Sequence, residues 1–162
     1  MNARVFTNSV AETHRKWLAK VLKIDLPIYN RGIDLVDDKI GIEIKCRLKK
    51  YSHNVAVHHY QLAQFRRDNQ NKELYWAVLL YDLTKDPKKI SKANLERFVK
   101  DRECWFLEWD YIKDFEVHYP ITGPYIYIRT KSFLDMQFKK VEKDGAIFHI
   151  PKESSLEARL LA

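Results

Sequence analysis

The chain has 162 residues, of which 46% are hydrophobic and 31% charged, so it has the size and composition of one globular domain. Four Gly, five Pro and the lack of any run of about 18 apolar residues exclude disordered, collagen-like and membrane-spanning classes. A formal net charge of +7 favours a polyanionic partner. The polar N-terminal residues do not form a secretory signal, so we expect a cytoplasmic protein in which Cys46 and Cys104 are packing residues.

The first predicted element is an amphipathic helix. Apolar residues recur at helical spacing from Val10 to Lys23. Ser9 and Glu12 have the spacing of a capping box, which predicts that the helix begins beside Ser9.

A β-hairpin is predicted next. Two alternating runs, Ile33 to Val36 and Ile40 to Leu48, flank the turn-like Asp37-Asp38-Lys39. Because the side chains of a strand alternate between its faces, Glu43 and Lys45 are expected to share one face.

The rest of the chain predicts further helices and strands without a linker or repeat, so residues 1–162 are expected to form one domain. Val57 to Asp68 is typical of a second helix, and the apolar run from Leu74 to Leu83 predicts a central strand covered on both faces. The sequence then predicts a helix at Lys92–Val99, strands at Cys104–Trp109, Pro124–Arg129 and Ala146–Ile150, and a terminal helix at Leu156–Leu161. This order indicates an α/β sandwich, a mixed sheet flanked by helices.

Charged residues of the hairpin suit metal-dependent hydrolysis of phosphodiester bonds. Asp34 lies in the first strand, and Glu43 and Lys45 lie in the second. Two neighbouring carboxylates are most easily kept ionised by a hard divalent cation such as Mg²⁺, for which Mn²⁺ would substitute, and the backbone carbonyl of Ile44 is a further oxygen ligand. Lys45 is placed to position or deprotonate a water molecule, or to stabilise charge on the phosphate.

The residues Ile33-Asp34 and Ile42-Glu43-Ile44-Lys45 resemble the core motif of the PD-(D/E)XK nuclease superfamily. The resemblance covers about residues 9–83 and implies a restriction-endonuclease-like fold with an αβββαβ core, whose extra strand would be Leu26–Tyr29. Ile33 stands where the motif has its proline. The resemblance implies that Asp34 and Glu43 are metal ligands and that Lys45 is the catalytic lysine.

The same resemblance indicates two further candidates for the active site. Many members of the superfamily carry an acidic residue on the first helix that completes the metal site, and Glu12 is the candidate here. The competing interpretation of Glu12 is the helix cap with Ser9. Gln61 resembles a glutamine near the active site of several subfamilies, and its competing interpretation is a surface residue of the second helix.

The sequence from Ile44 to Arg67 contains no Asp or Glu, which predicts a local positive field. This stretch and its surroundings supply the candidates for contacts with DNA, although each could also be an ordinary solvated side chain. The candidates are Arg31, Arg47, Lys49, Lys50, His58, His59, Arg66 and Arg67.

We therefore expect a Mg²⁺-dependent DNA endonuclease, site-specific in the manner of restriction or homing enzymes, in which residues 85–162 serve DNA recognition or dimerisation. A structure-specific Holliday junction resolvase is the first alternative, and both enzymes would cut two strands of double-stranded or branched DNA as symmetric homodimers. An RNA nuclease shares every feature. A non-catalytic basic nucleic-acid-binding module, in which Glu43 and Lys45 form only an ion pair, is the alternative from another class.

Overall fold

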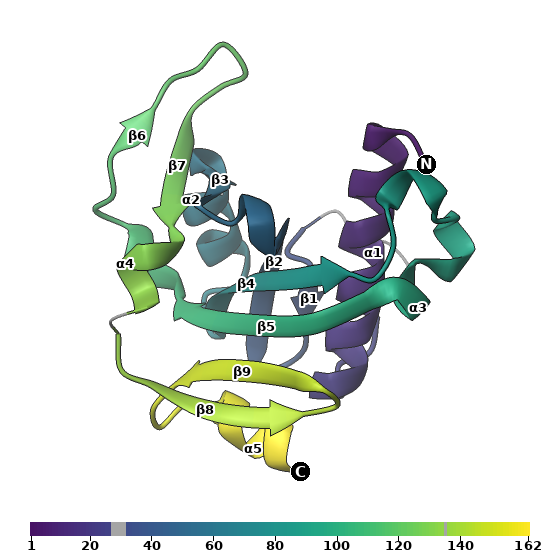
Figure 1. The fold of residues 1–162 in the computed structure, drawn as a ribbon. Coiled ribbons are helices and arrows are strands. Elements are labelled where there is room, and N and C mark those ends of the chain that lie inside the picture. The colour runs from purple at the N-terminus through teal and green to yellow at the C-terminus, as the bar shows by residue number, and fades with distance from the viewer. Residues whose placement is uncertain (27–31, 135) are drawn as a thin grey trace.

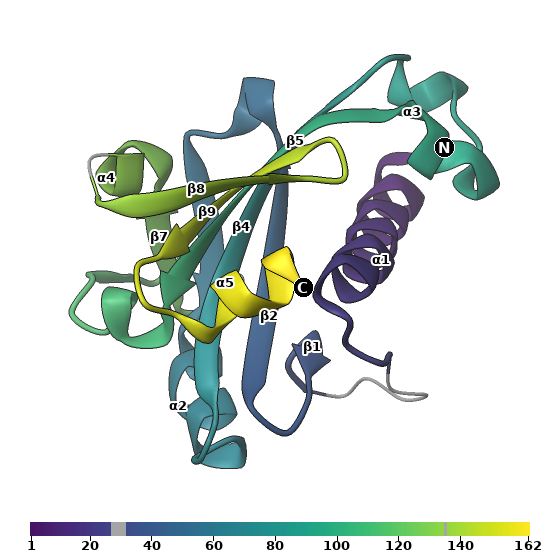
Figure 2. The same ribbon diagram turned by 90° about the horizontal axis from the view of Figure 1, so that it is seen from below.

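The computed structural model describes residues 1–26, 32–134 and 136–162. They form a six-stranded mixed sheet in the order β1-β2-β4-β5-β9-β8 and a three-stranded sheet in the order β3-β7-β6, with helices beside them (Figures 1 and 2). The helices are α1 (Ala3–Leu22), α2 (His59–Asp68), α3 (Leu95–Phe98), α4 (Thr130–Leu134) and α5 (Ser155–Leu161). The strands are β1 (Leu35–Val36), β2 (Ile40–Leu48), β3 (Asn54–His58), β4 (Glu73–Leu83), β5 (Val99–Glu108), β6 (Val117–His118), β7 (Tyr125–Arg129), β8 (Phe138–Lys143) and β9 (Ala146–Pro151). The mixed α/β class expected from the sequence is confirmed.

Helix α1 begins seven residues earlier than predicted, and its cap is a different residue. The side chain of Asn2 accepts a hydrogen bond of 2.9 Å from the Val5 N–H. Ser9 is buried inside the helix, so the predicted capping box of Ser9 with Glu12 is wrong. Asn2 satisfies a free N–H group of the first turn, and this allows the helix to start upstream of the apolar stripe.

The predicted hairpin is present, with a first strand of two residues. β1 pairs antiparallel with β2 through Leu35 opposite Ile42, and the Asp37 carboxylate accepts hydrogen bonds from the N–H groups of Lys39 and Ile40. Asp37 is therefore a turn former, as expected. The proposed extra strand at Leu26–Tyr29 falls mostly outside the described residues.

Helix α2 connects β2 and β4, which are parallel neighbours. The predicted start of this helix at Val57 is wrong, because residues 54–58 form β3. Val55 and Val57 are buried and pair with Ile128 and Ile126 of β7, so a strand far along the chain decides the local structure. The helix proper starts at His59.

Strand β4 lies between β2 and β5 and is covered on both faces, as predicted. Tyr75, Ala77 and Leu79 belong to the core beneath α1, whereas Trp76 and Val78 belong to a second core on the opposite face. Figure 2 shows α1 and α5 on one side of the six-stranded sheet and α4 and β7 on the other. The predicted core aromatics Trp76, Tyr81, Trp105, Phe106 and Trp109 are all buried, and Cys46 and Cys104 are free and pack in the core beneath α1.

In the C-terminal half, one predicted helix is wrong, and two strands, β6 and β8, have no predicted counterpart. The helix expected at Lys92–Val99 is one 3-10 turn followed by the short α3, because Val99 already pairs with Leu83 in the sheet. Strand β8 was not predicted, whereas the strands at 124–129 and 146–150 and the terminal helix are confirmed within one residue. None of the helices among the described residues has the length and apolar character needed to cross a membrane.

Candidate active site

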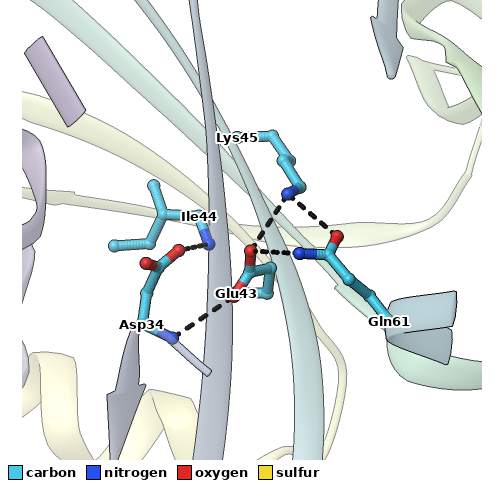
Figure 3. Close-up of polar contacts among 5 residues, drawn as sticks. All are labelled: Asp34, Glu43, Ile44, Lys45 and Gln61. Atoms are coloured by element: carbon cyan, nitrogen blue, oxygen red, sulfur yellow. Dashed lines mark hydrogen bonds and ion pairs between the residues drawn. The ribbon is translucent and has the colours of Figure 1, made fainter. Parts of the chain in front are cut away.

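Asp34, Glu43, Lys45 and Gln61 converge beside the middle of β2 (Figure 3). The Lys45 ammonium lies 3.0 Å from Oε1 of Glu43 and donates a hydrogen bond of 3.1 Å to Oε1 of Gln61. The Gln61 amide donates a hydrogen bond of 3.1 Å to the same oxygen of Glu43. Asp34 directly precedes β1, so it lies just outside the strand in which it was predicted. The chain before β1, strand β2 and the first turn of α2 therefore bring these four side chains to one place.

Hydrogen bonds between the strands hold the two carboxylates. Oδ2 of Asp34 accepts a hydrogen bond of 2.8 Å from the Ile44 N–H, and Oε2 of Glu43 accepts one of 3.3 Å from the Asp34 N–H. The N–H and the carbonyl of a strand residue point toward the same side of the strand. The Ile44 carbonyl consequently points toward the side of β2 on which Asp34 lies.

Both carboxyl groups have raised pKa values. Burial raises the pKa of Asp34 against the opposing effects of the Ile44 N–H and Lys45. Burial, with the nearby charge of Asp34 as a further contribution, raises the pKa of Glu43 to about 7 against the effect of Lys45. One lysine therefore does not offset the cost of burying two negative charges, and a further cation would lower that cost.

The alternation of β2 places these groups as the sequence predicted. Ile40 and Ile42 lie in the core beneath α1, and Glu43 and Lys45 share a face. Gln61 is buried with 7% exposure in the first turn of α2, so it is not a surface residue of the helix. Its hydrogen bonds to Lys45 and Glu43 also explain how a helix that follows β3 is positioned against β2.

Arg15 of α1 is a contributor that the sequence did not indicate. Its Nε donates a hydrogen bond of 3.0 Å to the backbone carbonyl of Asp34, and its Nη1 lies 3.3 Å from the carboxylate of Glu12. Glu12 also pairs with Lys16 at 3.6 Å. Glu12 is therefore linked to the Asp34 backbone through Arg15. A helical wheel identifies Arg15 as an i, i+3 partner of Glu12, but it does not show the contact of Arg15 with Asp34.

The end of β2 and the turn after it bring several of the candidate basic residues close to this centre. Arg47 shares the face of Lys45 by alternation, and Lys50 lies 5.0 Å above the ring of Tyr51. Lys49 forms an ion pair of 3.9 Å with Glu103 of β5. Burial and the charge of Lys45 lower the pKa of His58.

The other candidates lie elsewhere. His59 is the exposed first residue of α2, and Arg67 is in its last turn. Arg66 donates a hydrogen bond of 3.0 Å to the Lys72 carbonyl at the start of β4, the end of the sheet away from Arg47, so it fixes a turn there. Arg31 falls outside the described residues.

The described part of the chain contains no cluster of three or more His, Cys, Asp or Glu side chains of the kind that forms a closed metal centre. Mg²⁺ needs no such cluster, because it binds through one or two carboxylates and keeps several waters. Comparison with family models, curated proteins and solved structures found no match for this chain.

Proposed function

We propose that the protein is a Mg²⁺-dependent DNA endonuclease with Asp34, Glu43 and Lys45 at its active site. The observation that carries the proposal is the meeting of these three side chains with Gln61 beside the acid-free basic stretch from Ile44 to Arg67. The order of helix, antiparallel hairpin, helix and parallel strand also supports a restriction-endonuclease-like fold for residues 3–83.

The donor set fits Mg²⁺. Two carboxylates and the Ile44 carbonyl are hard oxygen ligands, and the raised pKa values of Asp34 and Glu43 indicate a buried pair that lacks compensating positive charge. Asp34, Glu43 and Ile44 would hold the ion, with Mn²⁺ as a substitute, and Glu12 would act by holding Arg15 against the Asp34 carbonyl. When bound, such an ion polarises the phosphate and makes a coordinated water more acidic.

The protein residues around the carboxylates have separate tasks. Lys45 is oriented by Glu43 and Gln61, which leaves its ammonium fixed for a contact with a water or a phosphate oxygen. Gln61 is a positioning residue, because it touches both Glu43 and Lys45. Arg47, Lys49, Lys50 and His58 would contact the phosphates on either side of the cleaved bond.

Residues 85–162 are available for recognition of DNA or for a symmetric dimer, since they add strands β5 to β9 to the proposed core. Both a site-specific enzyme and a junction resolvase would need such a surface. The non-catalytic binding module uses the same basic residues but assigns no role to the buried carboxylates. Cleavage therefore decides between the classes.

The test is a cleavage assay with Mg²⁺ on plasmid DNA, four-way junctions and single-stranded RNA. We expect Lys45→Ala and Glu43→Ala to lower cleavage at least about a hundredfold, a typical loss for a positioned catalytic group, while DNA affinity in EDTA changes little. Lys140→Ala, an exposed lysine of β8, is the matched control and should cleave normally. Wild-type protein that cuts none of these substrates, or cuts them equally well without Lys45, would refute the proposal.

A further inference from the structure

A cavity of about 310 Å³ lies directly beside the proposed active site. It is formed by the N-terminal half of α1, the second half of β2 and the start of β3. Lys45 belongs to both places, since its ammonium contacts Glu43 while the residue also lines the cavity. A molecule whose phosphate lies at Lys45 would therefore extend into this space.

The cavity exists because β2 loses its neighbour there. β1 pairs only with Gly41 and Ile42, so among the described residues no strand is hydrogen-bonded to this edge of β2 from Ile44 onward. Helix α1 and β3 stand on either side of that edge, as Figure 1 shows. The space is thus bounded by α1, β2 and β3, with Tyr51 of the 3-10 turn after β2 and Tyr81 of β4 completing its walls.

The lining is apolar and aromatic at the inner side and cationic at one border. Phe6, Val10 and the buried Tyr81 supply apolar and ring surface, and Tyr51 supplies a ring that is 63% exposed. Lys45 and Arg47 are the charged members, and the described residues that line the cavity include no Asp or Glu. Small-molecule sites are typically about 300–1,000 Å³, with mostly apolar walls and a few polar groups.

We infer that this cavity binds one unpaired nucleobase of the DNA strand, next to the phosphate held at Lys45. The positive charges of Lys45 and Arg47 at the border favour an anionic ligand even though Lys45 also contacts Glu43, and the aromatic residues favour a flat ring that stacks on them. A duplex is too wide for the cavity, so the base must leave the stack to enter it. The inference rests on the proposed function and adds a substrate class, DNA with an unpaired nucleotide at the site of cleavage.

Binding of DNA in EDTA tests the inference without cleavage. The probes are a labelled duplex with one extra unpaired adenine and the same duplex fully paired. Base stacking on aromatic side chains predicts that the wild type binds the bulged duplex about tenfold more tightly. Equal affinity for the two probes would overturn the inference.

The matched variants place a phenylalanine inside or outside the cavity. Ala11→Phe fills the space from the exposed face of α1 and should remove the preference for the bulge, whereas Asn8→Phe, at an exposed position of α1 that does not line the cavity, should keep it. Tyr51→Ala, at the exposed rim, should lower the preference without affecting the core. An Ala11→Phe protein that melts like the wild type and keeps the preference would contradict a base in this cavity.

A second measurement separates this inference from the proposed function. The unpaired adenine is replaced by 2-aminopurine, whose fluorescence should change on binding to the wild type and not to Ala11→Phe. Lys45-dependent cleavage that treats paired and bulged DNA alike would overturn the cavity's role and leave the endonuclease standing. Tight, Ala11-dependent binding of the bulge without any cleavage would support the cavity and refute the endonuclease.

Discussion

Because two carboxylates are buried together, the ionised form of Glu43 destabilises the folded protein when no metal is present. Its pKa rises from 4.5 to about 7 in the folded protein, so the folded state binds a proton more tightly than the unfolded state does. Its contribution to stability is therefore fully present below pH 4.5 and is lost as the pH rises through 7. Function and stability conflict at this residue.

Glu43→Gln should therefore gain stability relative to the wild type as the pH rises. In EDTA, we expect the difference in the free energy of unfolding to move in favour of the variant between pH 4.5 and 7, by up to about 1.4 kcal/mol per pH unit. Denaturant unfolding at several pH values measures it. Glu142→Gln, at an exposed site on β8, is the control for removal of a carboxyl group, and a flat Glu43→Gln difference would contradict the raised pKa.

His14 should have the opposite dependence on pH. It is fully buried beneath the ring of Tyr81, and its Nδ1 accepts a hydrogen bond of 3.2 Å from Arg102. Burial and the charge of Arg102 lower the pKa of His14 from 6.5 to about 3, so the unfolded state binds the proton more tightly and stability is lost as the pH falls from 6.5 toward 3.

The comparison that isolates this effect is wild type against His14→Gln, which does not titrate. The free energy of unfolding of the wild type should fall relative to this variant by up to about 1.4 kcal/mol per pH unit on acidification below 6.5. His53→Gln serves as the control, because His53 is exposed. If both variants gave the same pH profile, the neutral state of buried His14 would be disproved.

At the scale of elements, the hairpin β1–β2 depends on the missing side chain of Gly41. A Cβ at this position would lie 2.7 Å from a methyl of Leu74 and 3.1 Å from a methyl of Ile33, both of which are buried. Ile33 precedes Asp34, so the packing that Gly41 permits also positions the carboxylate.

Gly41→Ala should destabilise the protein by about 1–3 kcal/mol through overpacking and should lower cleavage as Asp34 moves. Gly32→Ala is the matched control one residue before Ile33. A Cβ there meets no atom of the described residues within 4 Å, so its effect should stay within about 0.5 kcal/mol. Thermal melts and cleavage rates report the two effects, and an unchanged melting temperature for Gly41→Ala would show that Leu74 and Ile33 yield without cost.

Sequence periodicity predicted the elements that local pattern decides. The alternation of β2, the common face of Glu43 and Lys45, and the apolar run of β4 are of this kind. Periodicity did not predict the elements whose structure depends on pairing with a strand far along the chain. Val57 suits a helix locally but pairs with Ile126 in β3, and β8 is a polar edge strand with Phe138 and Val141 as its apolar contacts.

The candidate site shows the same division. Asp34, Glu43 and Lys45 follow from the spacing of one hairpin, whereas Gln61 reaches them only because β3 reverses the chain before α2 starts. The contact of Arg15 with the Asp34 carbonyl depends on how α1 packs on the sheet. The resemblance to a known motif indicated Gln61 as a candidate, but no local pattern along the sequence encodes its contacts or that of Arg15.

At the scale of the molecule, the basic residues lie unevenly across the sheet. Arg47 and Lys50 belong to the β2 side, where the sequence from Ile44 to Arg67 has no acid, while β8 forms the opposite edge with Lys140 beside Glu142. The net charge of +7 is therefore unevenly distributed, and basic residues that have no acidic neighbour in the sequence, such as Arg47 and Lys50, lie on the β2 side. A polyanion should approach the β2 side.

The salt dependence of DNA binding measures which of these basic residues contact DNA phosphates. Each phosphate contact contributes about 0.9 to the slope of log K against log salt, so Arg47→Ala and Lys50→Ala should each lower the slope by about 1 between about 50 and 200 mM salt in EDTA. Lys140→Ala removes the same charge from the opposite edge and should leave the slope as in the wild type. Equal effects of all three variants would mean that DNA responds to the net charge alone, because only a bound surface releases counterions at particular lysines and arginines.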